Sequence, residues 1–123
     1  MAEFLASHPK IAYVNYCGLP GDKYHAVAEK YLPNGSCGVV SFGVKGGREA
    51  AAAFMGHLKI AAIETHVADA RTCCLHPASS THRQMNDEQL IAAGVQPDLV
   101  RMSCGLEDKN DLIHDIAQAL DQI

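Results

Sequence analysis

The chain has 123 residues, of which 48% are hydrophobic and 20% are charged, a length and composition typical of one globular domain. Its net charge of -4 comes from scattered acids and bases, so no block of like charge predicts binding to nucleic acid or to a membrane surface. The apolar stretches are too short and too interrupted for a membrane span, and MAEFLASHPK lacks the features of a signal peptide. We therefore expect a cytoplasmic protein with one domain.

The first half of the chain predicts a helix end, a strand, a helix, a strand and a helix. These elements span residues 2–8, 11–17, 22–32, 37–44 and 48–58. Pro9 ends the first helix because proline disfavours helical geometry in the residue before it. Turn residues GLPGD precede the second helix, and Gly46 and Gly47 precede the third.

The second half begins with a strand followed by a loop and ends in a helix. The predicted elements are a strand and loop over residues 59–70, a strand at 71–75, a loop at 76–83, a helix at 86–94, a strand at 98–106 and a helix at 109–123. Asn86 is typical of a helix start and Gly94 of a helix end. The interleaved strands and helices predict an α/β (α+β) fold in which helices cover one face of a sheet.

The cysteines are odd in number, and most lie in apolar runs, which predicts buried, reduced thiols. They are Cys17, Cys37, Cys73, Cys74 and Cys104. No C-x-x-C motif occurs, and adjacent residues of a strand point to opposite faces, so Cys73 and Cys74 are not expected to share a metal ion. The sequence predicts no metal site.

The segment HPASSTHR, residues 76–83, places two histidines around three hydroxyl side chains. His76 and His82 could act as general bases toward these hydroxyl groups. However, no G-x-S-x-G motif accompanies them, so a serine hydrolase has little support. A loop held by its own side-chain hydrogen bonds is the favoured interpretation.

Arg101 interrupts the otherwise apolar strand LVRMSCGL. Apolar residues occupy both faces of this strand, so an arginine within it requires a partner. Its planar guanidinium can hold a carboxylate through two parallel hydrogen bonds, and that carboxylate can belong to an internal acid or to a ligand. The pattern leaves both possibilities open and slightly favours the internal ion pair.

Three segments together resemble the C-terminal domain of the pyridoxal-phosphate-dependent enzymes of cysteine and methionine metabolism. They are GLPGDKYHAVAEKYLPNGSCGVVSFGVKGG, LHPASSTHRQMNDEQLIAAGVQPDLVRMSCGLED and the final helix. The resemblance covers essentially all of residues 1–123, and VSFGVKGG with HPASSTHRQ is most similar to the O-acetylhomoserine sulfhydrylases. It implies the small C-terminal domain of a fold-type I enzyme, with a mostly antiparallel sheet covered by helices on one face.

The resemblance also implies roles for two residues. In the motif R-x-S-x-G-x-E, which begins at Arg101, the arginine of the family binds the α-carboxylate of the substrate. His66 occupies a polar position beside the substrate where relatives often carry serine or asparagine. The implied reaction is a γ-replacement in which sulfide or a thiol displaces acetate from O-acetylhomoserine, giving homocysteine or methionine. The related cystathionine γ-synthases and methionine γ-lyases are alternatives.

The Schiff-base lysine of the family and its cofactor-binding residues lie in an earlier domain that these segments do not include. Lys45 belongs to VSFGVKGG and does not match that lysine. We therefore expect no catalytic or cofactor-binding residue in this chain, no pyridoxal phosphate bound to it alone, and no activity. The implied partners are the missing pyridoxal-phosphate-binding domain and the substrate carboxylate. The chain is also expected to bind further copies of itself, as a dimer here and as a tetramer in the full-length enzymes of the family. A non-catalytic interaction module, from a split gene or proteolysis, is the alternative.

Overall fold

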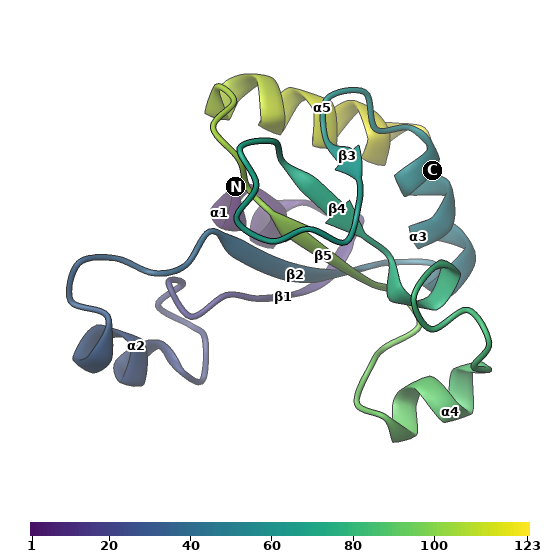
Figure 1. Ribbon diagram of the computed structural model, residues 1–123, viewed down its shortest axis with the longest axis horizontal. Helices are drawn as coiled ribbons and strands as arrows, with labels where there is room; N and C mark the ends of the chain where they lie inside the picture. Colours follow the sequence, from purple (N-terminus) through teal and green to yellow (C-terminus); the bar gives the residue numbers. More distant parts are fainter.

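A computed structural model describes residues 1–123 and contains one five-stranded sheet with the strand order β1-β2-β5-β4-β3 (Figure 1). The strands are β1 (Ile11–Asn15), β2 (Val39–Val44), β3 (Ala62–Ile63), β4 (Cys73–Leu75) and β5 (Leu99–Ser103). β3 and β4 are parallel, whereas the other neighbouring strands are antiparallel. The mostly antiparallel sheet that the family resemblance implied is therefore confirmed.

Helices cover one face of this sheet, as the sequence predicted. The helices are α1 (Ala2–Ser7), α2 (His25–Tyr31), α3 (Gly47–Gly56), α4 (Asp87–Ala92) and α5 (Lys109–Asp121), with a 3-10 helix η1 (Pro77–Ser79). Buried residues of α1, α3 and α5 share one core cluster with the strands. In contrast, α2 and α4 lie at opposite ends of the molecule, away from the sheet (Figure 1). No helix combines the length and the hydropathy that crossing a bilayer requires.

The core lies between the sheet and these three helices. On β5, Val100 and Met102 are fully buried in the core cluster, whereas Arg101 between them is only partly buried. Successive side chains of a strand point to opposite faces, so Arg101 lies on the face opposite the core. Phe42 of β2 and Phe54 of α3 pack edge to face within the core, with ring centroids 5.9 Å apart.

The helix expected over residues 22–32 begins later, at His25. The Asp22 side chain explains the difference, because it accepts hydrogen bonds from the backbone N–H groups of Tyr16 at 3.1 Å and Tyr24 at 2.8 Å. Such side-chain contacts stabilise a turn in competition with a helix. The apolar positions Tyr24, Val27 and Tyr31 remain exposed because α2 does not pack on the sheet.

Four predicted strands are shorter than expected. β1 ends at Asn15 and not at residue 17, and β4 begins at Cys73 and not at residue 71. β2 begins at Val39 and not at residue 37, which leaves Cys37 exposed, so the prediction of a buried thiol is wrong there. β5 begins one residue later than expected, at Leu99, and ends at Ser103, three residues early. Beyond it, the backbone N–H of Leu106 donates to the carbonyl of Ala70 and no longer to a strand. The predicted loop over residues 76–83 contains η1.

Asp115 connects α5 to the segment that follows α3. Its side chain is buried, and the carboxylate accepts backbone hydrogen bonds from residues 59–61 at 2.8, 2.9 and 3.0 Å. Burial raises the pKa of Asp115, but the backbone hydrogen bonds together lower it further, so the pKa lies below its ordinary value. The ionised carboxylate therefore holds three backbone donors that have no other partner in the sheet.

We expect Asp115→Asn to lower the free energy of unfolding by about 2–3 kcal/mol at pH 7, because a neutral amide satisfies fewer of these donors. The contribution is complete above the pKa of the unfolded chain, 3.8, and is lost as the pH falls through the lower folded-state pKa. Urea unfolding at pH 7 and pH 3 measures both effects, with exposed Asp121→Asn as control. Equal stability of the wild type and Asp115→Asn at pH 7 would contradict the assignment.

Candidate functional site

Arg101 lies at the centre of the sheet, with Ser41 of β2 and Leu75 of β4 opposite it on the neighbouring strands. Its Nη2 atom donates to the carbonyl oxygen of Thr65 at 2.7 Å and lies 3.4 Å from that of His66. None of the ion pairs of the structure includes Arg101. The internal ion pair that the sequence pattern slightly favoured is therefore absent.

The Nε atom of Arg101 is buried and has no hydrogen-bond partner. It is the only such side-chain atom in the chain. A buried donor without an acceptor costs about 1–3 kcal/mol, so its presence calls for an explanation. A carboxylate accepts two parallel N–H bonds from a guanidinium, which would satisfy Nε. The guanidinium of Arg101 therefore has a buried donor that no acceptor of this chain satisfies.

The structure brings His66 beside Arg101 through its backbone carbonyl. Its exposed imidazole turns toward two acids, with Nδ1 3.0 Å from Glu64 and 3.3 Å from Asp69. Arg71 lies 3.0 Å from Glu64 and 3.6 Å from Asp69. The Nε2 atom of His66 has no partner within the chain.

Glu64, His66 and Asp69 form a group that sequence spacing did not reveal, with one ligand atom from each lying within 4.8 Å of the others. Such a set could hold a metal ion, but the Arg71 guanidinium already pairs with both carboxylates. The pKa of Asp69 is lowered mainly by a hydrogen bond from the backbone N–H of Arg71, and to a smaller extent by one from the His66 side chain. The arrangement is therefore an ion-pair network next to Arg101.

The hydroxyl-rich loop after β4 is engaged in contacts of its own. His76 is buried, and its Nε2 lies 2.8 Å from the carbonyl of Pro97 while Nδ1 lies 2.9 Å from the Ser79 hydroxyl. The Ser80 hydroxyl donates to the carbonyl of His76 at 2.6 Å. Burial lowers the pKa of His76, which keeps the ring neutral. These contacts favour the structural interpretation of the loop over a hydrolase site.

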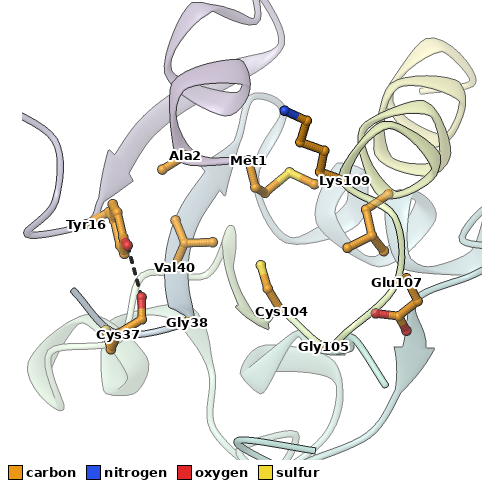
Figure 2. A pocket seen from close by; sticks show the side chains of 11 residues that line it. Met1, Ala2, Tyr16, Cys37, Gly38, Val40, Cys104, Gly105, Glu107 and Lys109 are labelled. Atoms are coloured by element: carbon orange, nitrogen blue, oxygen red, sulfur yellow. Dashed lines mark hydrogen bonds between the residues drawn. The ribbon is translucent and has the colours of Figure 1, made fainter. Parts of the chain in front are cut away.

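A mostly apolar cavity of about 290 Å³ lies elsewhere, between α1, the end of β5 and α5 (Figure 2). Tyr16 closes one side by donating its hydroxyl to the carbonyl of Cys37 at 3.0 Å. Cys104 points into the cavity, and burial raises the pKa of its thiol, so the thiol is not activated as a nucleophile. Arg101 and His66 do not line this cavity.

Comparisons with known proteins show which family the chain belongs to. Residues 1–121 match the model of the family described as Cys/Met metabolism PLP-dependent enzyme. The chain belongs to this family. It is 44% identical to an O-acetyl-L-homoserine sulfhydrylase of Leptospira meyeri over all of its own length and 28% of the relative's. It is also 44% identical to a homocysteine synthase of Schizosaccharomyces pombe, over 98% of its own length and 28% of the relative's.

A solved structure of the family has the same fold. It is a Campylobacter jejuni protein assigned as an O-acetylhomoserine (thiol)-lyase, with pyridoxyl-lysine phosphate in its chain. The TM-score is 0.87 at 37% identity, and the match covers 98% of this chain and 28% of that one. The chain thus spans little more than a quarter of the length of these relatives.

The residues around Arg101 do not fit the cofactor itself. No lysine side chain donates a hydrogen bond to the segment 64–72, and Lys45 donates to the carbonyl of Pro9 at 2.7 Å. The cationic group of the site is a guanidinium, which cannot form the imine bond that holds pyridoxal phosphate to these enzymes. The residues around Arg101 therefore offer no anchor for pyridoxal phosphate.

Ala68, in the segment that carries His66, adopts a left-handed conformation with φ of 59° and is the only residue other than glycine with positive φ. This conformation costs about 1–2 kcal/mol for a residue with a Cβ atom. We expect Ala68→Gly to raise the free energy of unfolding by about 0.5–1 kcal/mol, after the greater flexibility of glycine in the unfolded chain is subtracted. Thermal or urea unfolding measures the change.

The matched control is Ala53→Gly, at an exposed position within α3. It is expected to destabilise the chain by about 1 kcal/mol, because glycine is unfavourable inside a helix. Destabilisation of similar size by both substitutions would argue against strain at Ala68.

Proposed function

We propose that the chain is the C-terminal, substrate-binding domain of an O-acetylhomoserine sulfhydrylase and that Arg101 holds the α-carboxylate of the amino-acid substrate. The observation that carries the proposal is the buried Nε of Arg101, which has no partner in the chain. The Nη2 contact with Thr65 orients the guanidinium and leaves Nε for the ligand. The names of the relatives supply the class of substrate.

His66 is the second substrate-binding residue of the proposal. Its Nδ1 is held between Glu64 and Asp69, which fixes the orientation of the imidazole. Its other nitrogen, Nε2, has no partner in the chain and is available to a polar group of the substrate. Arg101 and His66 would then bind different parts of one amino acid.

In the complete enzyme, pyridoxal phosphate would supply carbanion stabilisation for a replacement in which the Cγ–O bond of O-acetylhomoserine breaks, acetate leaves, and sulfide or a thiol bonds to Cγ. The part of this chain is to bind and orient the amino acid, which reduces the entropy that the reacting groups must lose. Without a suitable lysine the chain alone does not catalyse the reaction. Its partner is the pyridoxal-phosphate-binding domain.

Exposed apolar side chains lie within the segment 64–72 or next to it. Ile63, Val67 and Leu106 are all exposed, Leu106 by 86%. Clusters of exposed apolar residues commonly mark surfaces that another domain covers. We assign this surface to the pyridoxal-phosphate-binding domain, which would also exclude water from Arg101. Exposed Tyr24, Val27 and Tyr31 on α2 offer a second surface, for the expected dimer.

Arg101 can be tested in a chimaera in which this chain replaces the matching segment of the Leptospira meyeri relative. Arg101→Ala is expected to remove about 2–5 kcal/mol of binding, so kcat/KM for O-acetylhomoserine falls at least about 30-fold. Arg101→Lys keeps the charge but loses the planar, two-pronged guanidinium. Its kcat/KM should lie between those of the unsubstituted chimaera and Arg101→Ala. Steady-state homocysteine formation measures the effect.

Arg83→Ala is the matched control, because Arg83 is exposed and forms no ion pair. It should leave kcat/KM within about twofold. Unchanged kinetics of Arg101→Ala in an active chimaera would refute the proposed role of Arg101.

The chain alone, supplied with pyridoxal phosphate, O-acetylhomoserine and sulfide, is expected to form no homocysteine above the protein-free blank. The physical reason is the absence of a lysine suited to anchor the cofactor. The active chimaera serves as the positive control in the same assay. Sustained turnover by the chain alone would show that it carries a complete active site.

A further inference from the structure

Alternate residues of the segment from Arg101 to Glu107 contact one loop, residues 64–72. Arg101 donates to the carbonyl of Thr65, and the Ser103 hydroxyl accepts the backbone N–H of Ala68 at 3.0 Å. The spacing is that of one face of a strand and its extension. The motif R-x-S-x-G-x-E therefore describes a row of attachment points for this loop.

Glu107 and Thr72 form the far end of the row. The Glu107 carboxylate accepts the Thr72 backbone N–H at 2.7 Å and the Thr72 hydroxyl at 2.8 Å. The same hydroxyl accepts the backbone N–H of Gly105 at 2.9 Å. Burial raises the pKa of Glu107, but the hydrogen bonds from Thr72 lower it further, so the carboxylate is ionised at neutral pH. Hydrogen bonds to a charged acceptor are among the stronger ones.

Gly105 permits the close approach of the loop to this end. A Cβ atom at Gly105 would collide with the backbone of Ala70 and Arg71. The carbonyl of Ala70 in turn accepts the backbone N–H of Leu106 at 2.8 Å. The loop and the end of β5 therefore lie in direct backbone contact.

Ser103 holds the middle of the loop. Its side chain is buried, and its hydroxyl satisfies the N–H of Ala68, the residue with a φ of 59°. Backbone conformations of this kind persist only where neighbouring contacts stabilise them. The Ser103 hydrogen bond thus stabilises the residue of the loop whose backbone conformation is the least favourable.

The position of the loop determines the orientation of Arg101. The Nη2 atom contacts only carbonyl oxygens of the loop, those of Thr65 and His66. A long arginine side chain has up to about 2 kcal/mol of rotamer freedom to lose on binding. A guanidinium that is fixed before the ligand arrives loses less of this freedom at the moment of binding.

We propose that Ser103, Thr72 and Glu107 are positioning residues, which fasten the loop 64–72 to the end of β5 and thereby fix the Arg101 guanidinium for its carboxylate. The part that concerns the carboxylate rests on the proposed function. The ordering of Arg101 does not, because it depends only on contacts within this chain.

The experiment is NMR relaxation of the Arg101 Nε–H group in the ¹⁵N-labelled chain. In the wild type the order parameter of this bond should be about 0.8, and in Ser103→Ala, Thr72→Val and Glu107→Ala it should fall below about 0.6. Thr72→Val keeps the shape of the buried side chain and removes only its hydroxyl. Thr72→Ser restores the hydroxyl and should restore the order of Arg101.

Two controls separate positioning from general destabilisation. Ser41→Ala changes the residue opposite Arg101 on β2, whose hydroxyl forms no hydrogen bond, and Glu29→Ala removes an exposed carboxylate on α2. Both should leave the order parameter of Arg101 unchanged. Core amide resonances, compared in every spectrum, show that each variant is folded.

An order parameter of Arg101 that stays near the wild-type value in folded Thr72→Val and Ser103→Ala would overturn the proposal, as would an equal loss in Ser41→Ala. The chimaera keeps this result separate from the proposed function. Loss of order in these variants together with full activity of Arg101→Ala would retain the positioning role and reject the carboxylate role. Unchanged order in these variants together with loss of activity in Arg101→Ala would reject the positioning role and retain the carboxylate role.

Discussion

Arg101 places a positive charge on the middle strand of a sheet whose other face is the hydrophobic core. β5 is paired on both sides, by β2 and β4, so its backbone has no freedom to move the charge toward water. Val100 and Met102 fix the strand from the core side. The segment 64–72 then covers the opposite side, and its carbonyl groups satisfy part of the guanidinium. The guanidinium keeps further N–H donors, and of these Nε is buried without a partner.

The sequence identifies Arg101 as a charge within an apolar strand. It does not separate the core face of this strand from the opposite face, because apolar residues occur on both. Local patterns also predicted the strand around Arg101, the helix start at Asn86 and a helix over residues 109–123. The structure confirms Asn86, shortens the strand to Leu99–Ser103 and ends the helix at Asp121. The Asn86 side chain and Gln89 form a reciprocal capping box, which a local pattern specifies well.

The contacts of the site could not be predicted in the same way. Thr72 and Glu107 are 35 residues apart, and nothing in either local pattern indicates that they meet. The start of α2 was misplaced because Asp22 bonds to the preceding turn, a choice that depends on the position of Tyr16 in the folded chain. The alternation of serine, glycine and glutamate after Arg101 was the available signal for the missing contacts. The role of these residues could be assigned only once the position of the loop 64–72 beside them was known.

The attachment of one loop at successive points on one strand also affects how the chain opens. Ala68, Ala70 and Thr72 all bond to the segment between Ser103 and Glu107, so releasing one of them strains the neighbouring bonds. Segments held in this manner tend to unfold as one cooperative unit. The amide protons of the loop would then exchange with solvent together, at a rate set by the whole loop. The hydrogen bonds that hold the loop in place for the proposed substrate site would then also set the free energy of its local unfolding.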